Sequence, residues 1–337
     1  MSIKSMIKSN IPDSMMERIQ RARSRRALNK YMKTESKRFA SSFAVPSSYS
    51  KRQVESRLVF YVHQIEKGFS FETYGYGRGH SALSHIAALF QKLSASDASW
   101  RQNAVYKEAI LALGEYRRRH VQANKDISFM DGLFDSETRK EIKEASQKVY
   151  QSIEIVDRPR GIRRGMSFAE LTRSRHAVRT YSKQPVARAE LEEAITLALR
   201  TPSVCNRQPA RVRIYTDSGI IRKALRIQSG FGGYDLPPAL VLVTADQQAF
   251  IGVNEHNEGY VDGGLFAMSL LYALEACDLA ACPLNTMFNA SADKQTRQLL
   301  NIPDNEVFIM YIAVGHFNDV SKICLSKRFD LRHILVN

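Results

Sequence analysis

The sequence predicts an α+β protein in which an N-terminal all-helical domain precedes a mixed sheet flanked by helices. Apolar residues recur every three or four positions between residues 51 and 155, which is typical of helices packed on a core. Helical and strand-like segments alternate after residue 165, and no convincing strand pattern comes before residue 160. With 337 residues, of which 44% are hydrophobic, the chain can form two domains of ordinary size.

Residues 1–50 form a basic arm. The first 60 residues contain 14 Lys and Arg against 4 Asp and Glu, and the whole chain has a net charge of +15. We expect a helix over Asp13–Met32 and a Ser-rich linker over Phe39–Ser50. Such an arm suits an anionic membrane surface, or it is simply a solvated helix face. A nucleic-acid partner is not expected, because the sequence lacks a recognisable nucleic-acid-binding motif.

The sequence shows no transmembrane or secretory segment. No run approaches the ~18 apolar residues of a membrane span, and the N-terminus is polar and basic. We therefore expect a cytoplasmic protein, with peripheral membrane association through the arm. The four cysteines include no CxxC pair, so neither a disulfide nor a metal site is expected.

Four helices are expected in the helical domain, residues 51–155. The first ends at Gly68 as a left-handed cap, and the fourth covers Ser136–Ile155. The segment His63–His80 is polar, aromatic and rich in glycine, but its glycine spacing is not that of a nucleotide loop. It is either a surface loop or a cover over an active site. In the second case the candidate substrate contacts are His63, Glu66, Lys67 and Arg78.

A basic linker, Asp157–Gly165, leads into the third part, residues 165–337. The segment Val261–Ala276 is apolar on nearly every side, which predicts a central helix or a helix at a subunit interface. The other expected helices are Phe168–Arg175, Glu190–Arg200, Ser218–Gln228 and Ala292–Leu300, and the expected strands are Ala210–Tyr215, Ala239–Ala245 and Val307–Val314.

Two arginines and one turn are the first candidates for ligand binding. Arg175 and Arg179 are four apart, so we expect them to share one helix face. Two guanidinium groups on one face can bind a phosphate through charge-assisted hydrogen bonds. The alternative is a solvated basic face, since Arg173 and Arg188 are close by. The turn within Thr201–Tyr215 combines a hydroxyl with two amides, which can bind polar ligand atoms.

Four segments together resemble the FMN-dependent nitroreductase family: residues 174–186, 201–215, 260–285 and 314–335. The resemblance covers about half of the chain and implies an FMN site in which the flavin carries the chemistry, so no catalytic side chain is expected. Two departures are Ala177, where the family often has serine, and Ala210, where it often has tryptophan. The cofactor-binding residues that the resemblance implies are Arg175, His176, Ala177, Arg179, Ser203, Asn206, Cys282, Pro283, Leu284, Asn285 and Arg328.

The resemblance also implies an activity and an assembly. We expect ping-pong hydride transfer from NAD(P)H to an unknown small-molecule acceptor, in a homodimer with two flavins at its interface. The HQIEKG segment is similar to one in nitroreductase-like proteins of bacterial polysaccharide gene clusters, which points to polysaccharide or lipid-linked sugar metabolism. The alternative is a non-catalytic flavin-binding scaffold that docks on a membrane or partner through its basic arm.

Overall fold

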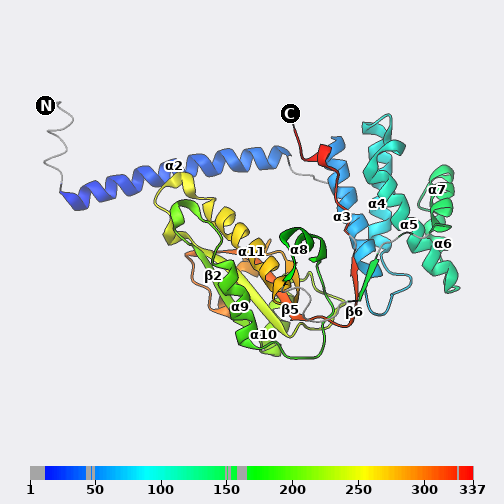
Figure 1. The fold of residues 1–337 in the computed structure, drawn as a ribbon. Helices are drawn as coiled ribbons and strands as arrows, with labels where there is room; N and C mark the ends of the chain where they lie inside the picture. The colour runs from blue at the N-terminus through cyan, green and yellow to red at the C-terminus, as the bar shows by residue number, and fades with distance from the viewer. Residues whose placement is uncertain are drawn as a thin grey trace.

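The structure is a computed structural model, and it describes residues 12–42, 47, 50–148, 150, 153–157, 165–324 and 326–336. Figure 1 shows two bodies side by side, with one long helix, α2, running across the second. We call the first body the helical region (α3 to α7) and the second the sheet region (β2 to β5 with α8 to α12). Most of the predicted linker, residues 158–164, lies outside the described residues.

The helical region has a core of its own. Buried apolar side chains from Val54 to Ala145 form one cluster, with Tyr106 and Phe69 almost fully enclosed. Side chains of Ser50, Asn103 and Asp135 accept a backbone N–H at the starts of α3, α5 and α7, which satisfies one exposed donor of each helix. The elements are α3 (Lys51–Phe69), α4 (His80–Ser96), η1 (Trp100–Gln102), α5 (Ala104–Gln122), α6 (Ser128–Asp131) and α7 (Ser136–Ser146).

Two predictions for this region were wrong. Gly68 lies inside α3, which ends one residue later and is capped by Ser70 at an ordinary φ of −88°. The fourth helix stops at Ser146, and a strand, β1 (Ile153–Asp157), follows it. Because β1 pairs with a strand near the C-terminus, no local periodicity could reveal it.

The sheet region is built on four strands in the order β2-β3-β5-β4, each pair antiparallel. Successive residues of β3 contribute to different apolar clusters, Val241 and Val243 to one and Leu240 and Leu242 to the other. Helices therefore cover both faces, which explains the uninterrupted apolar run of β3. The strands are β2 (Ala210–Tyr215), β3 (Ala239–Asp246), β4 (Leu279–Leu284) and β5 (Glu306–His316).

Helices α9 and α11 pack on one face of this sheet, and α10 and α12 pack together on the other. The central helix, α11, contacts all four strands, as its apolar sequence predicts. The predicted helix Phe168–Arg175 ends one residue early, at Ser174. The elements are α8 (Phe168–Ser174), α9 (Arg188–Ala198), η3 (Val204–Asn206), α10 (Ser218–Gln228), η4 (Gln247–Ala249), η5 (Val253–Glu255), α11 (Glu258–Ala276) and α12 (Ala290–Leu300).

The C-terminal segment leaves the sheet region and returns to the helical region. Strand β6 (Val320–Cys324) pairs with β1 in a separate two-stranded sheet. Beyond it, Lys327 forms an ion pair with Glu108 of α5, and the guanidinium of Arg52 on α3 lies 5.6 Å from the ring centroid of Phe329. The last described element is η6 (Leu331–His333). The two bodies are thus tied together by the tail.

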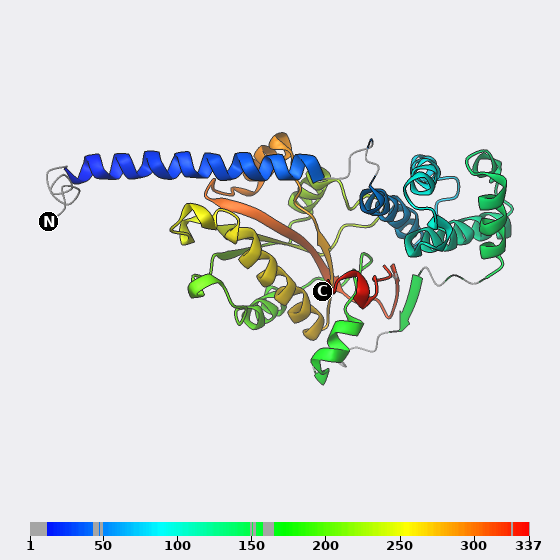
Figure 2. The same ribbon diagram turned by 90° about the horizontal axis from the view of Figure 1, so that it is seen from above.

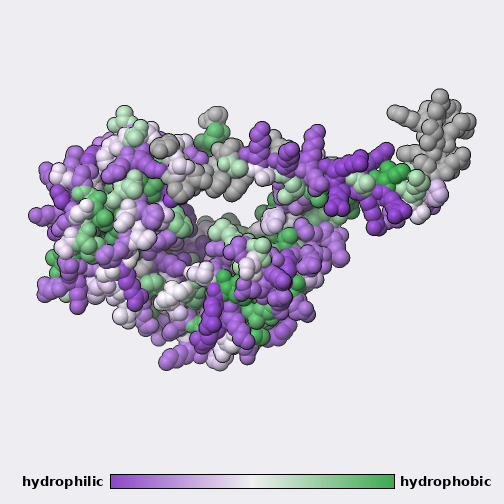
Figure 3. All heavy atoms as spheres, turned by 180° about the vertical axis from the view of Figure 1, so that it is seen from behind, coloured by the Kyte–Doolittle hydropathy of each residue, from purple (hydrophilic) through white to green (hydrophobic). Residues whose placement is uncertain are grey.

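Helix α2 (Asp13–Ser42) is longer than predicted and includes the first part of the expected linker, whose residues 43–46, 48 and 49 are not described. Its N-terminal part projects past the sheet region, and mostly hydrophilic residues line it (Figures 2 and 3). Near its other end, the Glu35 carboxylate accepts hydrogen bonds from His256 (2.9 Å) and Asn257 (3.1 Å). Among the described residues, no helix has the length and apolar character of a bilayer span.

Two neighbouring glycines of α11 test the packing of this helix on the sheet. A Cβ at Gly263 would lie 2.5 Å from Ile309 Cγ1 of β5, whereas one at Gly264 would meet nothing within 4 Å. Gly263→Ala should lower the free energy of unfolding by about 1–3 kcal/mol, partly offset by better helix propensity. Gly264→Ala should leave it unchanged or raise it by up to about 1 kcal/mol. Chemical denaturation of both variants measures this, and equal effects would contradict the packing.

Candidate functional site

The segment from Arg175 to Arg179 is extended and lies beside β4. Helix α8 ends at Ser174, and the Val178 N–H donates to the carbonyl of Ala281 at 3.0 Å. The prediction of a shared helix face was therefore wrong, because pairing with β4 overrides the helical spacing. Val178 is buried here, while Arg175, Ala177 and Arg179 are half-buried.

Arg179 meets a lysine from the helical region. Its guanidinium lies 5.9 Å from the ring centroid of Tyr234, and the Lys67 ammonium lies 5.7 Å from the same centroid. The Lys67 Nζ donates to the Gly230 carbonyl at 2.8 Å, and the Tyr234 hydroxyl donates to the Lys67 carbonyl at 3.3 Å. Phe71 packs edge-on against Tyr234 with centroids 4.9 Å apart. The C-terminal end of α3 thus contacts the sheet region through Lys67.

The electrostatics around these side chains are cationic. Burial and then the neighbouring charge of Arg179 lower the pKa of Lys67. Burial raises the pKa of the Cys282 thiol, against the influence of Arg179, Lys67 and Arg175. Within the described part of the chain none of these three cations forms an ion pair. Half-buried cations without acidic partners favour an anionic ligand.

The end of β4 forms one wall beside these cations. Cys282 is fully buried, which fits packing better than nucleophilic chemistry. Pro283 is half-buried and Leu284 is buried. The carbonyl of Asn285 accepts a hydrogen bond from Gln228 Nε2 at 3.2 Å. Gln228 also accepts from the Gly230 N–H at 2.7 Å, so it links β4 to the loop that holds Lys67.

The turn that contains Ser203 and Asn206 is strained and tightly held. Cys205, Asn206 and Gln208 have φ values of 47°, 55° and 52°, a conformation that non-glycine residues seldom adopt. The Ser203 hydroxyl accepts the Gln208 N–H at 2.9 Å, so it braces the turn from within. The Asn206 side chain is exposed. Such strain persists only where the surroundings enforce it, and it is common at binding sites.

Two acidic residues that the sequence analysis did not identify enforce this turn. The buried Asp262 of α11 accepts the Val204 N–H with both carboxylate oxygens at 3.2 Å. Glu255 accepts two hydrogen bonds from Arg207, at 2.6 and 2.9 Å. Arg207, and then the N–H groups of Ile251 and Gly252, lower the pKa of Glu255 to about 2. Both acidic residues lie far from the turn in the sequence. The one available signal was for Asp262, because an acidic residue is unusual in an otherwise apolar helix.

The turn and the cations lie near opposite ends of α11 in one chain. Asp262 holds the turn, while the Ser174 hydroxyl, next to Arg175, donates to Glu275 at 2.9 Å. These two α11 residues are 13 positions apart, which corresponds to about 20 Å of helix. One chain by itself therefore does not combine the two predicted parts of the flavin site.

Two of the four predicted substrate residues lie together with a cysteine. His63 Nδ1 is 3.6 Å from Glu66 Oε2, and both are close to the Cys324 sulfur at the end of β6. A hydrogen bond with Cys324, and then one with Glu66, raise the pKa of His63 to about 9. The Tyr150 hydroxyl donates to the other oxygen of Glu66 at 3.2 Å. Cys324 is 258 positions beyond Glu66 and was not among the predicted site residues.

The remaining predicted residues lie elsewhere or point away. Arg78 is exposed, and its carbonyl accepts from the Tyr116 hydroxyl at 2.7 Å. Arg328 is exposed on the tail and donates to the Ser326 carbonyl, so the structure does not bring it to Arg175 and Arg179. The His176 ring is within hydrogen-bond distance of the Ser174 carbonyl, 2.8 Å from Nδ1.

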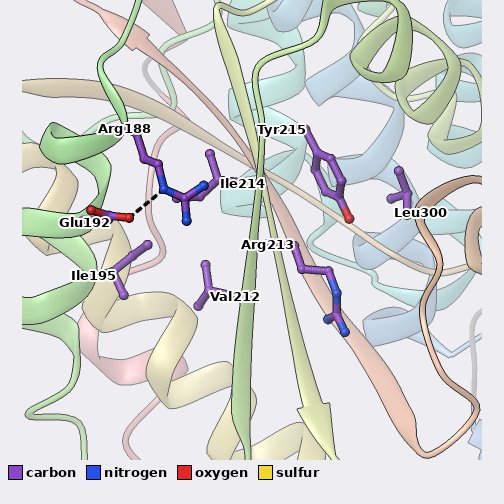
Figure 4. Close-up of a pocket in the computed structure, with 8 residues that line it drawn as sticks. All are labelled: Arg188, Glu192, Ile195, Val212, Arg213, Ile214, Tyr215 and Leu300. Carbon is purple, nitrogen blue, oxygen red and sulfur yellow. Dashed lines mark hydrogen bonds and ion pairs between the residues drawn. The ribbon is translucent and has the colours of Figure 1, made fainter.

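A surface pocket of about 540 Å³ follows the edge strand β2 (Figure 4). Arg188 and Glu192 of α9 pair with each other at 2.7 Å, and Arg213 pairs with Glu306 at 2.6 Å. The charged side chains of this pocket are therefore already paired, and the residues that line the pocket lie on both sides of β2. We do not assign the ligand site to it. The pocket is lined by Arg188, Glu192, Ile195, Val212, Arg213, Ile214, Tyr215 and Leu300.

Comparison with protein families identifies the fold of the sheet region. Residues 172–231 and 229–316 match the model described as the Nitroreductase family. The C-terminal half contains a nitroreductase family domain. The match includes the segment Arg175–Arg179, the strained turn and β4, and it ends before β6. The oxidoreductase fold that was expected for this half is thereby confirmed.

Solved structures similar to this chain overlap it over about half of its length. A putative NADH oxidase from Clostridium acetobutylicum is 20% identical, with 49% of this chain and 98% of that chain covered and a TM-score of 0.43. A putative nitroreductase from Bacillus subtilis is 18% identical, with coverages of 50% and 98% and a TM-score of 0.43. A putative nitroreductase in complex with FMN from Desulfovibrio desulfuricans is 20% identical, with coverages of 50% and 95% and a TM-score of 0.42. A comparison with curated proteins found no match.

The contact between Asp262 and the strained turn can be tested by substitution. Asp262→Ala leaves the half-buried Val204 N–H without its acceptor, which should lower the free energy of unfolding by about 1.5–3 kcal/mol. Asp262→Asn retains an acceptor and should recover most of this loss. Thermal and denaturant unfolding of both variants provide the measurement. Equal stability of the Ala variant and the wild type would mean that the carboxylate does not hold the turn.

Proposed function

We propose that the chain is an FMN-dependent oxidoreductase that transfers hydride from NAD(P)H to a small-molecule acceptor in a ping-pong reaction. The observation that carries the proposal is the gathering of Arg175, Arg179 and Lys67 around Cys282, without an acidic partner among the described residues. The family match to the same residues of the sheet region supports it.

The residues present suit FMN. The cofactor combines a phosphate dianion, a polar chain and a flat apolar ring, and the site offers three cations beside the buried end of β4. Arg175 and Arg179 would hold the anionic groups, and Cys282 to Asn285 would flank the ring. Lys67, from the helical region, would be the third cation, whereas the resemblance had included Arg328 among the cofactor-binding residues. When bound, the flavin supplies the hydride chemistry, and the protein supplies binding and electrostatics.

For the physiological acceptor we propose only a chemical class. Lys67 and Tyr234 place the end of α3 against the cationic group, so the helical region would border the acceptor. A cationic border suits an anionic acceptor, such as a phosphorylated or lipid-linked sugar. This agrees with the resemblance of the HQIEKG segment to proteins of polysaccharide gene clusters.

Flavin retention tests the cationic group. Arg175→Ala with Arg179→Ala should give a folded protein without yellow colour, because each charge-assisted contact contributes about 1.5–3 kcal/mol. Arg328→Ala is the matched control, since this exposed arginine lies outside the group, and it should stay loaded. Absorbance of the purified variants gives the flavin content. A fully loaded double variant would refute the assignment, and a wild-type flavin that neither NADH nor NADPH bleaches would favour a non-catalytic scaffold.

We infer that the working unit is a homodimer formed through α11. Exposed apolar side chains lie along one side of this helix, namely Tyr260, Val261, Leu265 and Met268. An isologous pair of antiparallel α11 helices would place the turn of one chain near the cations of the other. Ser203 and Asn206 would then reach the flavin across the interface, which explains why one chain anchors the two parts near opposite ends of α11.

Charge on this face should separate the two chains. Leu265, which is 47% exposed, would lie in the interface, so Leu265→Glu should give a monomer that has lost most of its flavin. Val121→Glu places the same charge at a 52% exposed position on the helical region and should leave both properties unchanged. Light scattering and absorbance measure mass and flavin together. A flavin-loaded monomer of either variant or wild type would contradict the dimer.

We further propose that the basic arm binds an anionic membrane surface by electrostatics alone. Helix α2 carries nine Lys and Arg against three Asp and Glu and has no apolar face, so it offers charge but no surface for insertion. Each basic residue near such a surface adds about 1 kcal/mol, and salt screens the effect.

Deletion of residues 1–42 tests the arm and leaves the Ser50 cap of α3 in place. The truncated protein should lose sedimentation with anionic vesicles at low salt while keeping its flavin. Wild-type protein should lose the same sedimentation at high salt. Equal vesicle binding by the two proteins at low salt would eliminate the membrane proposal.

A further inference from the structure

The cluster of His63, Glu66 and Cys324 joins the two ends of the chain. His63 and Glu66 lie one turn apart on α3, and Cys324 is the last residue of β6. One ligand-type atom from each residue lies within 4.8 Å of the other two. The absence of CxxC pairs predicted that there is no metal site. That pattern detects only ligands close in sequence, and Cys324 is far from His63 and Glu66 in the sequence.

The three atoms form the mixed nitrogen, oxygen and sulfur set that zinc prefers. Tetrahedral zinc separates its ligand atoms by about 3.4–3.6 Å, given Zn–S near ~2.3 Å and Zn–N or Zn–O near ~2.1 Å. The His63–Glu66 separation of 3.6 Å already fits, and the other pairs need to close by at most about 1.3 Å. Three protein ligands leave one position open, the number found in catalytic zinc sites.

Further contacts orient the ligands. Tyr150 donates to Glu66 Oε1 at 3.2 Å, which leaves Oε2 on the side of His63. The Ser326 hydroxyl donates to the Cys324 sulfur at 3.4 Å. Such partners of metal ligands fix their orientation and raise affinity. Cys324 is buried while the His63 side chain is 42% exposed, so an ion can enter from the solvent side.

We propose that His63, Glu66 and Cys324 bind a divalent cation of the zinc type, with the fourth position left to water or an acceptor oxygen. The site would join α3 of the helical region to β6 and would lie next to Lys67. It requires neither flavin nor a second chain. Without metal, the same residues would form only a hydrogen-bonded network, and that is the alternative to be tested.

Metal counting on the full-length protein gives the first test. After treatment with a chelator, the protein is dialysed against Zn²⁺ or Co²⁺ and its metal content is measured. We expect one ion per chain, and for Co²⁺ a thiolate-to-metal charge-transfer band with the visible bands of tetrahedral cobalt. Absence of stoichiometric metal, or a cobalt spectrum without the thiolate band, would overturn the proposal.

Variants identify the ligands. Cys324→Ser should abolish the thiolate band and weaken Zn²⁺ binding at least tenfold, and Tyr150→Phe should weaken it by roughly 10–100-fold. Cys205→Ser is the control, because this exposed thiol is the one that would bind metal adventitiously, and the variant should keep the site. Equal Zn²⁺ affinity of Cys324→Ser and wild type would exclude the site, as would loss of binding in Cys205→Ser.

A measurement on the unaltered protein covers the case in which Cys324 variants fail to fold. Alkylation of each cysteine is followed by mass spectrometry with and without Zn²⁺. Bound metal should slow the alkylation of Cys324 at least tenfold and leave Cys205 unaffected. Unchanged reactivity of Cys324 in the presence of saturating Zn²⁺ would overturn the proposal.

Discussion

The arrangement of this protein depends on three cations for which the described residues provide no acidic partner. Arg175 and Arg179 come from an extended segment beside β4, and Lys67 comes from a helix more than a hundred residues earlier. Burial and the neighbouring charge of Arg179 lower the pKa of Lys67, so keeping Lys67 charged at this place opposes folding. A bound anion would offset that cost, so the site and the stability of the contact between the two regions are linked.

Helix α11 determines where the other parts of the site lie. Through Asp262 near its start it holds the strained turn, and through Glu275 near its end it holds Ser174 beside the cationic segment. Its exposed apolar side chains begin beside Asp262, at Tyr260 and Val261, and continue to Met268. A single helix thus sets both the separation of the two parts in one chain and the geometry by which a second chain would reunite them.

The spacing of apolar residues along the sequence predicted those helices and strands that turn one apolar face toward a core. The helix Ser218–Gln228 and the strand Ala210–Tyr215 have the predicted bounds, because a helical stripe and an alternating run each face a core. Strands β1 and β6 were not predicted, since each is stabilised by the other across the length of the chain. The same reason explains why Cys324 was not predicted as a site residue. It also explains why the helix face predicted for Arg179 was wrong, because the neighbouring Val178 bonds to Ala281 of β4.

The candidate site shows the same division. Motif resemblance predicted Arg175, Arg179 and the turn as binding residues, and the family match includes these segments, whose residues are close in sequence. It also included Arg328 among the cofactor-binding residues, whereas the structure leaves Arg328 exposed on the tail and places Lys67 beside Arg179. Lys67 was expected to contact substrate, and only the folding of α3 onto the loop at Gly230 and Tyr234 reveals its place among the cations.

The central claim is that this cationic group binds the phosphorylated cofactor, with the helical region contributing to it. The most direct measurement is a fluorescence titration of the flavin-free protein with FMN and with riboflavin, which lacks the phosphate. We predict that wild type binds FMN at least about 100-fold more tightly, and that Lys67→Met reduces this preference by about tenfold. Equal affinity for the two flavins, or an unchanged preference in Lys67→Met, would contradict the account.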